Sequence, residues 1–272
     1  MQEKLIDIEK VIKSKNPKLL RWLPQFLINY LKRKLHQDEV NQVLYENRAL
    51  FGYDFCQELI NRFKIKIEVK GLENIPKEGG YIFASNHPLG GMDAMALVTV
   101  MAPIRTDIKF IVNDILLNLK NLKGLFVGVN KHGVNSKESL NMVDELFGSN
   151  QAIFVFPAGL VSRRKNGIVA DLEWKKTFIT RAKKHQKSII PVYVGGSLSN
   201  FFYHLSNLRS SLGIKANLEM LYLADETFKQ KNKTLSIVFG KPIPSSFFDY
   251  SKSDKEWAKW METKVHNMKN DE

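Results

Sequence analysis

The sequence has little cysteine and lacks long apolar runs. Cys56 is the single cysteine among 272 residues, which excludes an internal disulfide framework and any site held by several cysteines. Its place in an apolar helical pattern favours a packed thiol. The longest uncharged stretch beside a predicted helix, residues 94–104, is well short of the roughly 20 apolar residues that a membrane-spanning helix needs. Residues 1–13, MQEKLIDIEKVIK, lack the apolar core of a signal peptide. We therefore expect a cytoplasmic protein that crosses no membrane.

Acidic residues are also scarce relative to basic ones. The chain carries 41 Lys and Arg against 28 Asp and Glu, a net charge of +13 at pH 7, and the calculated pI is about 9.6. Its hydrophobic content of 44% is that of an ordinary globular protein. The positive excess indicates an anionic partner, which can be a nucleic acid, a membrane surface or an acidic protein. Composition alone does not choose among the three.

The first 60 residues form a predicted helical segment that precedes a domain over residues 61–272. Leu27, Leu31 and Leu35 repeat at helical spacing, and three cations, Lys32–Lys34, follow at the end of the pattern. An interfacial membrane helix has this composition. A helix packed on the domain, with cations that favour its C-terminus, has it as well. We keep both interpretations at this stage.

From residue 65 onward, short predicted strands alternate with helices. This alternation indicates an α/β fold with a mostly parallel central sheet that is covered by helices. The predicted strands are residues 65–69, 81–84, 109–112, 125–129, 152–156, 189–194, 218–223 and 235–239. The predicted helices are residues 93–101, 136–147, 174–185 and 255–268.

The strongest chemical signal lies in residues 81–97, YIFASNHPLGGMDAMAL. On one continuous helix His87 and Asp93 would lie about 240° apart, whereas a turn made flexible by Gly90 and Gly91 can fold the imidazole onto the carboxylate. A carboxylate bonded to one ring nitrogen leaves the other free to take a proton, as in a general base. A turn histidine that is merely satisfied by a local carboxylate would look the same. We also expect Asp93 to be the N-cap of the following helix, with main-chain N–H groups near Gly90 to Met92 available to an oxyanion.

These residues resemble the signature block of the glycerolipid acyltransferase family, in which Asn-His is followed by a short Gly-containing turn and Asp. Later stretches resemble the family's other blocks in order: GLFVGVNK at 124–131, FPAGLVSR at 156–163, and an apolar strand around Pro191. Two departures stand out, because five residues instead of four separate His87 from Asp93, and Ala158 replaces a glutamate. Both resemble a branch whose members complete ornithine and related aminoacyl lipids. The resemblance implies the glycerolipid-acyltransferase-like fold. The predicted N-terminal helical segment, a candidate for membrane association by its composition, precedes this fold.

The resemblance implies an O-acyltransferase that moves a fatty acyl group from a thioester to the hydroxyl of a lysolipid, without an acyl-enzyme. His87 is then the general base, and Asp93 orients it. The absence of a Gly-x-Ser-x-Gly nucleophile motif agrees with direct attack. The matching blocks further imply these substrate-binding residues: Asn86, Gly90, Gly91, Lys131, Pro157, Gly159, Ser162, Arg163 and Arg164.

The departures also bear on the acceptor. Asn130-Lys131 stands where the family usually has Asp-Arg, and so a bidentate guanidinium for a phosphate is missing there. This favours a lyso-aminolipid of the lyso-ornithine or lyso-glycine type. One alternative is a lysophosphatidic acid acyltransferase that binds phosphate through Lys131 and Arg163. Another is a non-catalytic binder of anionic membranes.

The densest positive charge follows the third block. Residues 161–190 hold nine Lys or Arg against Asp171 and Glu173. This segment is either a solvated helix face or a dock for anionic lipid headgroups or acidic acyl carrier protein. We expect as partners a lysolipid, an acyl carrier protein or coenzyme A thioester, and the anionic inner face of the cell membrane. Nucleic acid is excluded because no recognition motif accompanies the charge. Histidine spacing indicates no metal site, and no cofactor is expected.

Overall fold

The computed structural model describes residues 6–15, 17–113, 119–129 and 137–271. The chain divides into two compact units, which are described separately. The smaller unit combines residues 1–50 with 199–230, and the larger combines 51–198 with 231–272. The boundary expected near residue 60 stays a prediction.

A mostly parallel sheet forms the centre of the larger unit, as predicted. Its strand order is β1-β9-β8-β2-β5-β3-β4, and within it only the β8–β9 pair is antiparallel. A separate hairpin pairs β6 with β7. The strands are β1 (Lys66–Lys70), β2 (Tyr81–Ser85), β3 (Ile108–Asn113), β4 (Phe126–Val129), β5 (Ala152–Val155), β6 (Arg163–Lys165), β7 (Ile168–Ala170), β8 (Ser188–Val194) and β9 (Thr234–Phe239).

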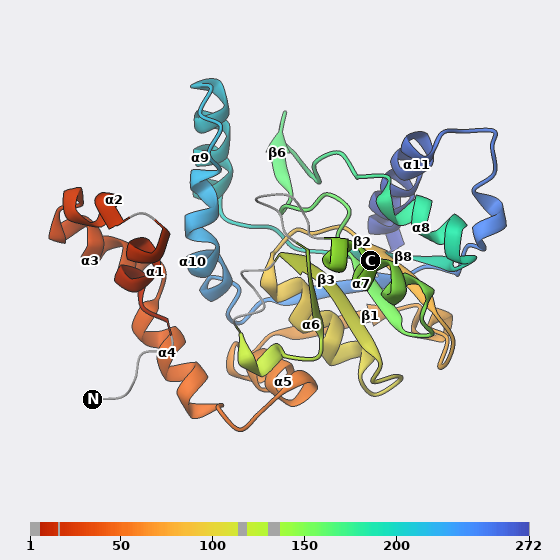
Figure 1. The fold of residues 1–272 in the computed structure, drawn as a ribbon, viewed down its shortest axis with the longest axis horizontal. Coiled ribbons are helices and arrows are strands. Elements are labelled where there is room, and N and C mark those ends of the chain that lie inside the picture. The colour runs from red at the N-terminus through yellow and green to blue at the C-terminus, as the bar shows by residue number, and fades with distance from the viewer. Residues whose placement is uncertain (1–5, 16, 114–118, 130–136, 272) are drawn as a thin grey trace. The chain divides into compact units, whose positions relative to one another are not determined.

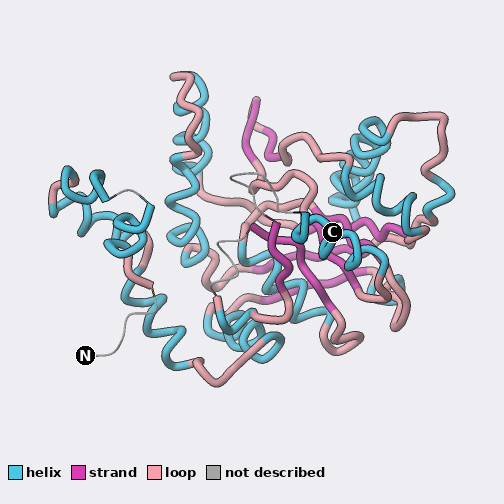
Figure 2. Tube along the Cα trace, in the orientation of Figure 1, coloured by secondary structure: helices cyan, strands magenta, loops and turns pink. Residues whose placement is uncertain are grey.

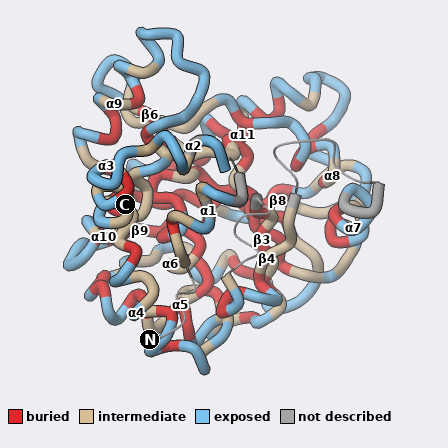
Figure 3. Tube along the Cα trace, turned by 60° about the vertical axis from the view of Figure 1, so that its left-hand side comes forward, coloured by how far each residue is buried: buried red, intermediate tan, exposed pale blue. Residues whose placement is uncertain are grey.

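Helices cover the sheet, and alternation along the strands supplies a core on each face (Figures 1 and 2). Ile82 and Ala84 point to the face that packs against α7 (Lys137–Gly148), α8 (Thr177–His185) and α11 (Asp254–Asn267). On the other face, Phe83 stacks on Phe154 with 4.6 Å between ring centroids. α5 (Gly52–Arg62) and α6 (Gly91–Met101) pack on each other, and α6 contacts β3. Figure 3 shows many of the buried, red segments in the interior of the fold, with tan and pale blue segments between them.

Connections out of the sheet diverge at β2 and β5. The chain leaves β2 through α6 toward β3 on one side, and it leaves β5 through α8 toward β8 on the other side. In open α/β sheets, the crevice at the carboxyl ends of such strands is where ligands bind. This topology places residues 86–93 and 156–163 at the same edge, because β2 and β5 are parallel neighbours.

The regular elements of the smaller unit are all helices in its described residues. A hydrogen bond of 3.0 Å joins the hydroxyls of Tyr30 and Tyr222, and His36 Nε2 lies 3.1 Å from Asp225 Oδ1. These contacts link the N-terminal helices to residues 199–230. The helices are α1 (Ile8–Lys15), α2 (Pro17–Trp22), α3 (Gln25–Lys34), α4 (Gln37–Glu46), α9 (Asn200–Ser211) and α10 (Leu223–Phe228). In the part of the chain that the structure describes, no helix is both long and apolar enough to span a bilayer.

One predicted element was wrong, and one element of the structure was not predicted. The strand predicted at residues 218–223 is a 3-10 turn, Leu218–Tyr222, that leads into α10. This turn buries Glu219 completely and lets its carboxylate pair with Arg209 of α9, which an apolar run read in isolation does not reveal. The sequence analysis also missed the β6–β7 hairpin, since the charged residues of β6 carry no strand pattern.

Candidate active site

The carboxyl ends of three adjacent strands meet around His87. β2 ends two residues before it, and on one side the buried Asn86 side chain reaches the end of β8. Its Nδ2 donates a hydrogen bond to the carbonyl of Val194, and its Oδ1 accepts one from the N–H of Val194, both with a length of 2.7 Å. On the other side Phe156, just after β5, stacks on the imidazole with 4.1 Å between centroids. The imidazole is thus held at the switch point of the sheet, and its side chain is 18% exposed.

The turn after His87 folds the imidazole onto Asp93, as the glycine spacing predicted. His87 Nδ1 lies 2.9 Å from Asp93 Oδ2. The same carboxylate accepts the main-chain N–H groups of Leu89 and Gly90 at 3.0 and 3.1 Å. Gly90 has φ of 76°, a conformation that favours glycine, and this reverses the chain ahead of the helix. Because Nδ1 faces Asp93, Nε2 is the nitrogen left for proton transfer.

Asp93 is not the N-cap that the sequence suggested. The helix begins at Gly91 with Gly90 as its N-cap, and Asp93 is the third helical residue, where its carboxylate reaches back to the Gly90 N–H. This is the acceptor half of a capping box. The Gly90 N–H is therefore already bonded to Asp93. Of the predicted oxyanion donors, the N–H groups of Gly91 and Met92 remain, and their role stays a prediction.

Burial shapes the electrostatics of this pair. Asp93 is fully buried, and its burial raises the pKa of its carboxyl above the ordinary value, while the hydrogen bond from His87 opposes that rise. Three donors reach this one carboxylate, which is how a buried charge is retained. The arrangement fits an oriented base better than a turn histidine that is incidentally satisfied.

A second carboxylate, Asp171, fixes the main chain of His87. Its Oδ1 accepts the N–H of His87 at 3.2 Å and the hydroxyl of Ser162 at 2.5 Å, and its Oδ2 accepts the indole N–H of Trp174 at 2.9 Å. The N–H of Ser162 also donates to the carbonyl of His87 at 2.9 Å. The third block is therefore bonded directly to the His87 turn. Sequence reasoning counted Asp171 only as an acid among cations, and its 84-residue separation from His87 hid the contact.

The remaining third-block residues form the start of the β6–β7 arm. The carbonyl of Pro157 accepts the N–H of Lys175 at 3.1 Å, which closes the loop that carries the arm. Gly159 has φ of 68° and donates to Phe156. The Arg163 guanidinium is buried and donates to the carbonyls of Val161 and Ser162. Arg164, next along β6, is half-buried.

The structure thus brings Asn86, Gly90, Gly91 and Ser162 to the His87–Asp93 pair. Pro157 and Gly159 lie in the loop after the neighbouring strand β5, and Arg163 and Arg164 lie on β6 directly after Ser162. Lys131 lies outside the described residues. The substrate-binding roles of all these residues stay predictions.

Several cations of residues 161–190 are paired, so the local excess is not one uniform patch. Arg181, Lys184 and His185 surround Asp144 of α7. Lys183 pairs with Asp254 of α11 at 2.9 Å. Much of the α8 charge therefore joins this helix to its neighbours, and the cations that are exposed near the β6–β7 arm are Lys165, Lys175 and Lys176.

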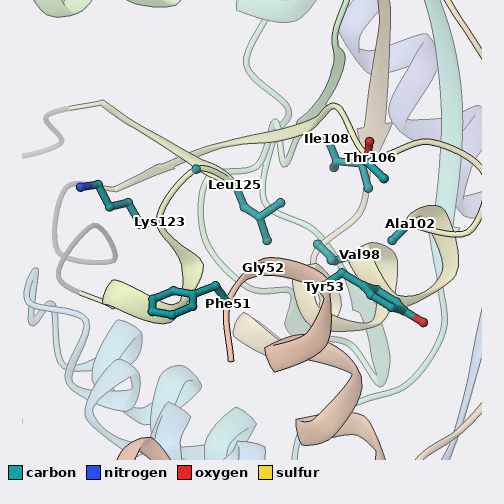
Figure 4. A pocket seen from close by; sticks show the side chains of 10 residues that line it. Phe51, Gly52, Tyr53, Val98, Ala102, Thr106, Ile108, Lys123 and Leu125 are labelled. Atoms are coloured by element: carbon teal, nitrogen blue, oxygen red, sulfur yellow. The ribbon is translucent and has the colours of Figure 1, made fainter. Parts of the chain in front are cut away.

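Two further features lie away from His87. Cys56 is buried in α5, as predicted, and its burial raises the pKa of the thiol to about 12, which makes it a poor nucleophile. A cavity of about 330 Å³ is lined by Tyr53, Val98, Ile108 and Leu125, among others (Figure 4). Ile108 begins β3 and Leu125 precedes β4, so this cavity is at the sheet edge opposite the His87 turn. Within the described residues, no cluster of three His, Cys, Asp or Glu could hold a metal.

Comparison with known proteins agrees with the chemistry of the site. A family model described as acyltransferase matches residues 10–272. A lyso-glycine lipid O-acyltransferase of Bacteroides thetaiotaomicron is 46% identical over 265 residues, which cover 97% of each chain. A protein of the same name from Phocaeicola vulgatus is 42% identical over 265 residues, covering 97% of this chain and 95% of that one. A solved structure of the 1-acyl-sn-glycerophosphate (LPA) acyltransferase PlsC from Thermotoga maritima aligns with a TM-score of 0.48 at 17% identity, covering 88% and 95% of the two chains.

Proposed function

The chain belongs to the acyltransferase family, and from that membership we propose that it moves a fatty acyl group from a thioester to the hydroxyl of a lyso-glycine lipid. The two relatives that carry this activity in their names match almost the whole chain. The observation that carries the chemistry is the His87 Nδ1–Asp93 Oδ2 contact of 2.9 Å at the carboxyl edge of the sheet.

The reaction proceeds by direct attack. His87 Nε2 removes the proton of the acceptor hydroxyl as its oxygen attacks the thioester carbonyl. Asp93 holds the imidazole in orientation through Nδ1 and stabilises the imidazolium that forms. When the C–S bond breaks, the imidazolium returns the proton to the thiolate, and ester and free thiol leave. The N–H groups of Gly91 and Met92, at the start of α6, stabilise the oxyanion.

The acceptor assignment also has support from the arginines. Arg163, one of the two residues that a phosphate-binding alternative needs, is buried with its guanidinium bonded to main-chain carbonyls. Arg164 follows it on β6 and is the candidate for the carboxylate of the acceptor's glycine headgroup. A headgroup carboxylate needs a single cationic partner, whereas a phosphate dianion favours several.

An acyl carrier protein or coenzyme A thioester supplies the acyl group, and no other cofactor takes part. The exposed Lys165 is the last residue of β6, and the exposed Lys175 and Lys176 follow β7 within six residues. These cations can meet the acidic surface of a carrier protein or the phosphates of coenzyme A. The enzyme works on the inner face of the cell membrane, where its lysolipid acceptor resides.

An acceptor panel tests this proposal. Purified protein is incubated with acyl carrier protein and coenzyme A thioesters and with lyso-glycine lipid, lyso-ornithine lipid and lysophosphatidic acid, separately and in competition, and products are identified by mass. We expect diacylated glycine lipid as the main product. Conversion of lysophosphatidic acid alone would refute the acceptor assignment while leaving the acyltransferase chemistry intact.

A further inference from the structure

Helix α9 is apolar on two sides. Phe202, Tyr203 and Ser206 are buried on one side. Phe201, Leu208 and Leu212 lie at positions i, i+7 and i+11, which is the other side, and they are 48%, 57% and 65% exposed. The turn that follows adds further exposed apolar side chains, Ile214, Leu218 and Leu221. A contiguous apolar surface of this kind marks an interaction site.

This surface exposes no acidic side chain from residues 199–226. Residues 199–218 contain Arg209 and Lys215 and no acidic residue. The three acids that follow are buried. Glu219 pairs with Arg209 at 2.8 Å, and Glu226 and Asp225 both pair with Lys229. Arg209 is neutralised by Glu219, so the exposed side of this segment is apolar with one exposed cation, Lys215. A surface that is apolar and exposes no carboxylate suits an anionic lipid surface, where cations of the same unit can contact the headgroups.

The N-terminal helices of the same unit have the same character. Trp22 at the end of α2 is 86% exposed, and Phe26 at the start of α3 is 74% exposed. Residues 8–34 hold eight Lys or Arg and a single acid, Glu9. Glu9 is itself paired with Lys32. The leucine stripe, for which both a membrane-facing and a packed interpretation were kept, is half-buried, so the exposed large apolar side chains that the structure describes in these helices are Trp22 and Phe26.

We propose that residues 199–221 and helices α1–α3 form one membrane-docking surface, which inserts Leu208, Leu212, Trp22 and Phe26 into the acyl boundary of an anionic bilayer. The inference deepens the proposed function, because it names how the enzyme reaches a membrane-resident lysolipid. Trp and Leu enter the interfacial layer, and the surrounding cations contact anionic headgroups.

Vesicle flotation with the full chain tests the docking surface. The probe variant is Leu208→Glu/Leu212→Glu, and the matched control is Leu140→Glu/Met142→Glu, because the control residues are 47% and 58% exposed on α7 of the other unit. The vesicles contain phosphatidylglycerol in phosphatidylcholine, without lysolipid or thioester. We expect the probe variant to bind at least tenfold more weakly than wild type, and the control variant to bind within twofold of wild type. Equal loss in both variants would overturn the proposal.

Two further measurements separate the other outcomes. If a second copy of the chain covered α9, sedimentation without lipid would show a wild-type dimer that the probe variant dissociates, and this would overturn the docking surface. Activity toward a short-chain, monomeric lyso-glycine lipid should be unchanged in the probe variant. Vesicle binding by wild type without any acyl transfer to lyso-glycine lipid would refute the proposed function and leave the docking surface standing.

Discussion

At the scale of single residues, the central feature is the buried carboxylate of Asp93, which accepts hydrogen bonds from three donors. Asp93 accepts His87 Nδ1 and two main-chain N–H groups, and these bonds offset the desolvation that raises its pKa. Each donor lies within residues 87–90, at most six residues before Asp93. The local turn therefore supplies these hydrogen bonds to the carboxylate, while Asp171, Ser162 and Phe156 hold the main chain and ring of His87 from distant segments.

Replacing His87 with alanine should reduce stability in a pH-dependent way. The folded-state pKa of Asp93 is already raised above its unfolded value, and loss of the His87 bond raises it further. The folded carboxyl then takes up a proton as pH falls, before the unfolded one does, so the destabilisation is largest at high pH and shrinks toward low pH. We expect a loss of about 1–3 kcal/mol at about pH 8 and less near pH 5, measured by urea denaturation. The exposed His204→Ala is the control, and a pH-independent loss would contradict this account.

Asp171 should act through the position of His87. Asp171→Asn weakens its acceptance of the His87 N–H and removes a negative charge that raises the pKa of Asp93. We expect kcat to fall by about 10- to 100-fold with KM nearly unchanged, and the acidic limb of the pH–rate profile to move to lower pH. Ser162→Ala and Trp174→Phe each remove one donor to the same carboxylate and should give smaller losses without the pH shift. If the acidic limb of the pH–rate profile does not move in Asp171→Asn, Asp171 has a structural role only and the prediction is wrong.

The site could be predicted only where its residues are close in sequence. His87 and Asp93 are six residues apart, and a glycine turn between them is a visible signal. Asp171 is 84 residues from His87, and its role depends on β2 and β5 being neighbours. The burial of Arg163 was likewise invisible, since an arginine after a glycine turn normally suggests a surface residue.

At the scale of elements, strand ends fix the site. Asn86 joins the ends of β2 and β8 by two bonds to Val194. Asn86→Ala leaves two buried main-chain groups without these partners, which should cost about 2–6 kcal/mol in unfolding free energy. Asn74→Ala removes a single bond to Phe239 and should cost about 1 kcal/mol. Chemical denaturation measures both, and a loss for Asn86→Ala no larger than for Asn74→Ala would contradict the role of this link.

Apolar runs predicted the sheet strands well because buried parallel strands are nearly continuous hydrophobic segments. β2, β5 and β8 are of this kind. The apolar run at residues 218–223 wrongly predicted a strand. The ion pair between Glu219 and Arg209 of α9, which accompanies the 3-10 turn, cannot be seen in the run itself. The β6–β7 arm, with Arg163 to Lys165 on one strand, lacks any apolar period and was missed for that reason.

At the scale of the whole molecule, the net charge is +13, and some of the cations form ion pairs within the protein. Asp144 and Asp254 neutralise cations of α8. Residues 8–34 hold eight cations and one acid, and of these cations Lys32 pairs with Glu9 and Lys34 lies 3.6 Å from Asp225, which leaves a positive excess. If these cations dock the protein on anionic lipid, ionic strength should weaken binding. Raising NaCl from about 0.05 M to about 0.5 M should reduce affinity for phosphatidylglycerol vesicles on the order of tenfold. Co-sedimentation measures this, and affinity that does not change with salt would contradict an electrostatic contribution.

The most direct test of the central claim is acyl transfer by the His87–Asp93 pair. Wild type, His87→Ala, Asp93→Asn and the control Glu78→Ala, an exposed position of the larger unit, are each given acyl thioester and lyso-glycine lipid, and diacylated glycine lipid is quantified by mass spectrometry. We predict a rate at least on the order of 10²-fold lower for His87→Ala and a clear loss for Asp93→Asn, with Glu78→Ala unchanged. Formation of diacylated glycine lipid by His87→Ala at the wild-type rate would contradict the account.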